Sequence, residues 1–156
     1  MKYEILKDEF IEFDGRKLYR IKALKDFHNV KEGEFGGYIE SEQNLSQEGD
    51  AWVCGNARVY GNAWVYGDAW VSGNAWVFGN NAVVWFSNVG TENGTLTVYC
   101  GKNDLIATRG CFTGSVEEFL AKSAEVHDEK AKREYELLIE VARSRLEEAQ
   151  GNIGSE

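Results

Sequence analysis

The stretch GDAWVC GNARVY GNAWVY GDAWVS GNAWVF occupies residues 49–78 and repeats one hexapeptide pattern without interruption. Each hexad begins with Gly and Asn or Asp, continues with Ala, and has Val at its fifth position. A degraded unit, GNNAVV, follows at 79–84. A fixed short period over consecutive units indicates a repeat architecture, so this stretch decides the fold.

The alternation within each hexad indicates how the chain runs. Successive side chains of a strand point to opposite faces, so the Ala and Val of one hexad share a face. The Gly followed by Asn or Asp suits a turn, because these residues tolerate turn and left-handed geometry. The repeat therefore predicts a short hexapeptide β-solenoid with Ala and Val inside.

The length of one coil decides which residues stack. A coil of three hexads pairs each residue with its equivalent three hexads later, such as Trp52 with Trp70 and Arg58 with Trp76. A coil of two hexads would instead pair equivalents two hexads apart, such as Trp52 with Trp64. We favour the coil of three hexads.

The segments on either side of the repeat predict caps, giving an α+β fold that is mainly β. Residues 1–48 form a β-rich N-terminal cap with a hairpin at Asp14-Gly15, and residues 49–84 form the solenoid. Residues 85–150 hold strands and two helices, and the first strand pattern, VVWFSNV at 83–89, crosses the boundary with the repeat. Residues 151–156 form a frayed tail. Ser115 and Glu118 are spaced as a capping box that opens the first helix, and Asp128 opens the second, from about 129 to 149.

Composition excludes several classes of protein. Hydrophobic residues make up 43% of the 156 residues, too many for a disordered chain. No apolar run is long enough for a membrane span, and no signal peptide is expected, so we expect no membrane partner. The three cysteines suit a reducing compartment. A net charge of −9 excludes duplex nucleic acid as the main partner.

The outer face of the repeat is the candidate binding surface. If Ala and Val point inward, the other positions present aromatic rings and one cation: Trp52, Arg58, Tyr60, Trp64, Tyr66, Trp70 and Trp76. A monomer rarely exposes so continuous an aromatic surface. Two interpretations stay open: the rings pack under the flanks or in a dimer interface, or they form a stacking platform for a base, a sugar or a partner side chain.

Catalytic and metal chemistry is sparse in the sequence. Neither His28 nor His127 lies in the repeat, which disfavours the acyltransferase chemistry of many hexapeptide proteins. No ligand spacing for zinc or motif for a cofactor is present, so we expect neither a metal nor a cofactor. Asp50 and Asp68 would stack in a coil of three hexads and could then face one cation. The preference of Asp for turns explains both residues without a metal.

The repeat resembles two known groups of proteins. Val53 with Ala57 and Val59 with Ala63 match the aliphatic and small positions of left-handed β-helices. The run from ALKDF at 23–27 through GEFGGYIE at 33–40 into the hexads resembles uncharacterised phage and prophage proteins, often labelled polymer-forming or bactofilin-like. That resemblance implies a β-solenoid and the cytoplasm of an infected or lysogenic bacterial host.

These observations favour a non-catalytic binding protein that counters host defence. It would sequester a small nucleotide-derived signal or dock on a host defence protein, and we expect it to form a homo-oligomer. A small anion would need local cations, for which Arg58, Lys102 and Arg109 are candidates. The alternatives are a self-assembling structural module and an acyltransferase-like enzyme.

Overall fold

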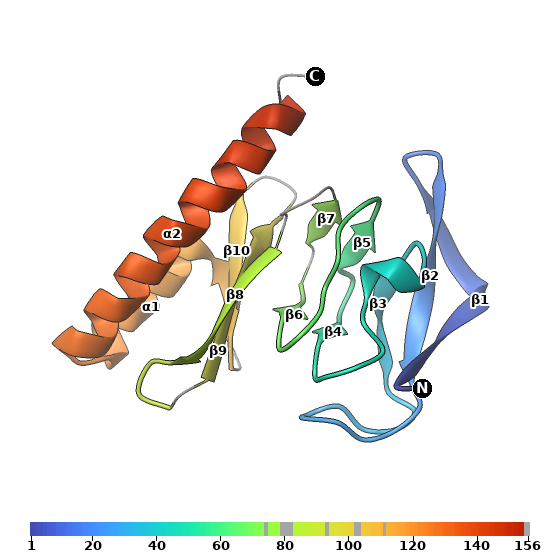
Figure 1. Cartoon of the computed structure of the whole chain (residues 1–156), viewed down its shortest axis with the longest axis horizontal. Helices are drawn as coiled ribbons and strands as arrows, with labels where there is room; N and C mark the ends of the chain where they lie inside the picture. The colour runs from blue at the N-terminus through green and yellow to red at the C-terminus, as the bar shows by residue number, and fades with distance from the viewer. Residues whose placement is uncertain (74, 79–82, 93, 102–103, 111, 155–156) are drawn as a thin grey trace.

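A computed structural model describes residues 1–73, 75–78, 83–92, 94–101, 104–110 and 112–154, with side chains up to residue 146. Lys102 and residues 79–82 of the degraded hexad therefore lie outside the described residues. The described part is mainly β with two C-terminal helices, and its elements follow one another across the molecule from the N-terminal hairpin to the helices (Figure 1).

The strands form three sheets in the described part of the chain. The first has the order β1-β2-β3-β5-β7 and contains Tyr3–Phe13, Arg16–Ala23, Phe35–Ile39, Arg58–Tyr60 and Trp76–Phe78. The second pairs β4 (Trp52–Val53) with β6 (Trp70–Val71). The third has the order β11-β10-β9-β8 and contains Phe112–Ser115, Leu105–Arg109, Gly94–Cys100 and Val83–Val89. A short 3-10 helix, Glu42–Asn44, precedes the repeat.

The predicted N-terminal hairpin is confirmed. Strands β1 and β2 pair antiparallel, with Phe13 opposite Arg16 at the turn. The two turn residues, Asp14 and Gly15, have φ angles of 53° and 74°. A two-residue turn with both angles positive matches the right-handed twist of the strands, which explains why Asp-Gly occupies it.

The inward orientation of Ala and Val in the repeat is confirmed. Ten side chains from five hexads are at most 3% exposed: Ala51, Val53, Ala57, Val59, Ala63, Val65, Ala69, Val71, Ala75 and Val77. They form one cluster together with Ile21, Ile39 and Leu45 from the preceding segment. Burial of these small apolar side chains therefore stabilises the repeat.

The pairing between strands of the repeat joins positions that are three hexads apart. Trp52 pairs with Trp70 in the second sheet, and Arg58 pairs with Trp76 in the first, both in parallel register. The alternative spacing of two hexads, which would pair Trp52 with Trp64, does not describe these strands. The first and fourth hexads thus share one sheet, and the second and fifth share another.

The predicted β-solenoid is wrong, and so is the fold implied by left-handed β-helices. The three sheets are separate, and none of them is closed or solenoid-like. The strands of the hexads are very short, and they divide between a mixed sheet and a two-stranded sheet. Outside the named strands, the pairing of Leu45 with Val65 is an isolated parallel bridge. Strand hydrogen bonds therefore do not run continuously around the repeat.

The C-terminal sheet caps the edge of β6 with side chains. The Trp70 backbone N–H donates to Thr97 Oγ1 at 3.1 Å, and the Ser72 N–H donates to the Tyr99 hydroxyl at 3.0 Å. Tyr99 also lies 2.6 Å from Thr108 Oγ1, and its burial raises the pKa of the phenol. These contacts satisfy backbone groups that an open strand edge would leave unpaired.

The two helices cover the C-terminal sheet (Figure 1). Helix α1, Val116–Val126, begins at the predicted capping box, in which Ser115 Oγ accepts the Glu118 N–H at 3.1 Å. Asp128 accepts the Ala131 N–H at 2.8 Å at the start of α2, Glu129–Gly154. Helix α2 continues past its predicted end near 149 into the segment that the sequence predicts to fray. Neither of these two described helices is long and apolar enough to cross a membrane.

Covered and open positions of the repeat differ in what their side chains contribute to stability. Trp52 is fully buried, with Tyr3 at 6.3 Å and Phe27 at 5.2 Å between ring centroids, whereas Trp64 is 55% exposed. We expect Trp52→Ala to lower the free energy of unfolding by about 3–5 kcal/mol, and Trp64→Ala by about 1 kcal/mol or less. Urea denaturation measures both, and equal losses would contradict the described packing.

Lys2 is a buried cation near the N-terminus of the chain, and its side chain reaches the first hexad of the repeat. Its ammonium donates to the carbonyl of Ala51 at 2.6 Å and lies 5.0 Å above the Phe27 ring. Desolvation lowers the pKa of Lys2 from 10.5 to about 8, although Asp50 partly opposes this effect. The folded chain therefore releases this proton at lower pH than the unfolded chain does.

The titration of Lys2 predicts a pH-dependent stability. Between the folded pKa of about 8 and the ordinary value of 10.5, the unfolded state binds more protons at this residue than the native state, so stability rises with pH. We expect the free energy of unfolding of the wild type to increase over this interval relative to that of Lys2→Met. Urea denaturation at several pH values tests this, and parallel pH profiles of the two proteins would refute it.

Candidate functional site

A pocket of about 490 Å³ lies between the repeat and the C-terminal sheet. Three parts of the chain line it: the loop before β3, the turns and strand of the first and fourth hexads, and strands β8 to β10 with their turns. The lining residues are His28, Asn29, Asp50, Asp68, Trp70, Ser87, Asn88, Gly94, Thr95, Thr108, Arg109 and Gly110. Two residues predicted from the sequence, Trp70 and Arg109, thus meet in one pocket.

Trp70 is the aromatic group of the pocket. Its side chain is half-buried, and its backbone is held by the hydrogen bond to Thr97. The His28 ring lies edge-on to the indole, with 5.7 Å between centroids. His28 has a φ of 46°, a left-handed conformation that non-glycine residues adopt at a cost and that often accompanies function.

Arg109 is the cation of the pocket, and it is held by contacts on two sides. Its Nε donates to the Tyr135 hydroxyl of α2 at 3.0 Å, and its side chain is 15% exposed. A Cβ at Gly94 would lie 2.6 Å from the guanidinium carbon, so a larger residue there would displace the Arg109 side chain. Glu92 lies 4.0 Å away but is 82% exposed, and such a pair is weak. Arg109 therefore retains the capacity to bind an anion.

Carboxylates and hydroxyls form the polar wall of the pocket. Asp68 Oδ2 accepts a hydrogen bond from Ser87 Oγ at 2.9 Å, and Ser87 Oγ lies 3.1 Å from Thr95 Oγ1. Asp50 occupies the same hexad position as Asp68, three hexads earlier. Carboxylates accept hydrogen bonds from hydroxyl and amino groups, which suits sugars and nucleobases.

The other candidate residues of the outer face lie apart from this pocket. Trp52 is covered by the N-terminal segment, as described above. Phe13 packs edge-on against Tyr60 at 5.4 Å and Trp76 at 4.7 Å, and the Arg58 guanidinium lies 4.6 Å from the Phe13 centroid. The interpretation in which the flanks cover the aromatic side chains is thus confirmed for these positions, and the single continuous aromatic face is wrong.

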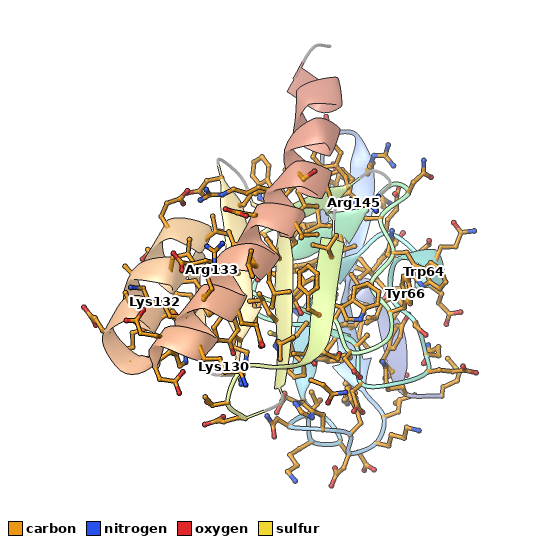
Figure 2. The ribbon with its side chains drawn as sticks, turned by 60° about the vertical axis from the view of Figure 1, so that its left-hand side comes forward. Trp64, Tyr66, Lys130, Lys132, Arg133 and Arg145 are labelled. Atoms are coloured by element: carbon orange, nitrogen blue, oxygen red, sulfur yellow. The ribbon has the colours of Figure 1, made fainter. Side chains whose placement is uncertain are left out.

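Trp64 and Tyr66 remain open at the surface. They are 55% and 40% exposed, and their rings stack with centroids 4.0 Å apart. Tyr66 also meets Trp85 of β8 edge-on at 4.5 Å. Figure 2 shows the pair side by side, separate from the basic residues that it labels on α2.

Sequence reasoning missed most of the polar lining. The repeat predicts that Asp50 and Asp68 stack, because they are three hexads apart like Trp52 and Trp70. It does not predict that both line a pocket. His28 lies outside the repeat, and no pattern links it to Trp70. Ser87 and Thr95 lie on β8 and β9, and no sequence pattern predicts that these strands pack against the repeat.

The cysteines of the core do not supply a nucleophile at neutral pH. Burial raises the pKa of the Cys54 thiol, and it raises the pKa of Cys100 to about 11. A thiol that remains protonated is a poor nucleophile. Within the described ranges, no three His, Cys, Asp or Glu side chains gather where they could hold a metal ion.

Comparison with known proteins assigns no family to the chain. Neither a protein-family model nor a curated protein sequence matches it. The chemistry of the pocket therefore carries the functional argument.

Proposed function

We propose that the chain is a non-catalytic binding protein that holds a small nucleotide in the pocket between Trp70 and Arg109. The observation that carries this proposal is the presence of an indole, a guanidinium and two carboxylates around one cavity. A nucleotide offers a partner to each: a base for the ring, a phosphate for the cation, and hydroxyl or amino groups for the carboxylates.

The size of the pocket and the net charge of the chain favour a small ligand. Its volume of about 490 Å³ falls within the range of about 300–1,000 Å³ that is typical of small-molecule sites. The net charge of −9 disfavours a long polyanion, which would meet repulsion over its whole length. One phosphate needs only the local cation, and Arg109 provides it.

The resemblance of the sequence to phage proteins supports a proposed setting for this activity. In the cytoplasm of an infected bacterium, a protein that binds a nucleotide tightly and does not turn it over would remove a signal from circulation. We infer that the chain counters host defence in this way. Sequestration needs a site that encloses the ligand, which favours this mode over docking on a host protein.

Titration with nucleotides tests the proposal. We expect one of AMP, GMP, CMP and UMP to bind at micromolar concentration or below in isothermal titration calorimetry. Arg109→Met should weaken that binding by about tenfold or more, because it removes a charge-assisted hydrogen bond.

The matched control is Arg58→Met, which removes a candidate cation outside the pocket. It should leave the affinity within about twofold, since Arg58 packs on Phe13. Circular dichroism confirms that both variants are folded. Absence of binding by all four nucleotides, or equal losses in the two variants, contradicts the proposal.

The exposed Trp64 and Tyr66 favour a second candidate function, a self-assembling structural protein. Stacked aromatic rings at the surface are typical of sites of association. We expect sedimentation equilibrium to show an oligomer for the wild type and a monomer for the double variant Trp64→Ser with Tyr66→Ser. A wild type that stays monomeric at high concentration excludes this function.

A further inference from the structure

A second cavity adjoins the candidate nucleotide pocket. It has a volume of about 410 Å³ and lies between α1, the turn after β8 and the end of β10. Arg109 and Gly110 line both cavities, so the two cavities adjoin at these residues. The guanidinium lies next to the Cα of Gly94, where an added Cβ would meet it, and 4.0 Å from Glu92; Gly94 lines the first cavity and Glu92 the second.

The second cavity has the chemistry of a ring site with a basic rim. Phe112 contributes a half-buried ring, which packs on the buried core residue Phe119 with 5.6 Å between centroids. Lys122 and His127 line the same space from α1 and its C-terminal end. His127 is oriented by Ser123, whose Oγ lies 2.7 Å from Nδ1. Aromatic rings beside cations are suited to a nucleobase next to a phosphate.

We propose that the ligand of this protein is a dinucleotide, whose bridging phosphate lies at Arg109 and whose two nucleosides occupy the two cavities. This inference rests on the proposed function and specifies its ligand class. Arg109 lines both cavities, so a phosphate bound there would lie within reach of both. Each cavity holds aromatic side chains, Trp70 in the first and Phe112 in the second.

Two linked nucleosides should bind more tightly than one. Once the first nucleoside is bound, the linker raises the effective concentration of the second at its own cavity. A gain in affinity of about tenfold or more over the mononucleotide is a conservative expectation for such linkage.

The test compares mononucleotides with dinucleotides in wild-type protein and in a variant with a filled second cavity. The probes are the four mononucleotides named above and ApA, GpG, CpC and UpU. Val126→Trp introduces a large side chain at a residue that lines the second cavity and is 58% exposed, so folding should tolerate it. Val141→Trp is the matched control, because Val141 is 50% exposed on α2 and lines neither cavity.

The proposal predicts a specific pattern of affinities. A dinucleotide should bind the wild type about tenfold or more tightly than its mononucleotide, and Val126→Trp should abolish that difference. The affinity for the mononucleotide should change by about twofold at most in both variants, and Val141→Trp should preserve the preference for the dinucleotide.

The contrary results separate this inference from the function on which it rests. If a mononucleotide binds but its dinucleotide binds no more tightly, or if Val126→Trp leaves the preference intact, the bipartite site is wrong and the nucleotide pocket stands. If no mononucleotide and no dinucleotide binds, both are wrong.

Discussion

The alternation of Ala and Val within each hexad imposes the constraint on which the rest of the structure depends. Both side chains are buried inside the repeat, so the large residues between them point to the opposite face of each strand. The protein covers most of these residues with other parts of its own chain. Phe27 and Tyr3 cover Trp52, and Phe13 covers the side that carries Trp76.

The same constraint accounts for the position of the pocket. The C-terminal sheet docks on β6 through Thr97 and Tyr99, and these side chains complete the edge of a strand that has no further strand partner on that side within the described chain. Docking along the strand leaves space next to the turns of the hexads, where Asp68 and Trp70 line one cavity with Arg109. Docking of the C-terminal sheet on β6 thus both completes the strand edge and forms the candidate site.

The sequence predicted the local features and missed those that depend on docking. The pairing of residues three hexads apart, the Asp14-Gly15 hairpin and the Ser115 cap were predictable, because period, turn chemistry and capping act within short stretches. The β-solenoid was wrong because the very short strands of the hexads do not close into coils here. The meeting of Trp70 with Arg109 depends on how two sheets pack, and side-chain volumes decide that only in three dimensions.

Hydroxyl-radical footprinting of the intact chain tests most directly whether the flanks cover the repeat. Mass spectrometry reports the oxidation rate of each tryptophan at low protein concentration. The described packing predicts that Trp64 is oxidised fastest, Trp52 slowest, and half-buried Trp70 at a rate between them. Oxidation of Trp52 as fast as that of Trp64 would contradict the account, because it would mean that the aromatic residues of the repeat share one open face.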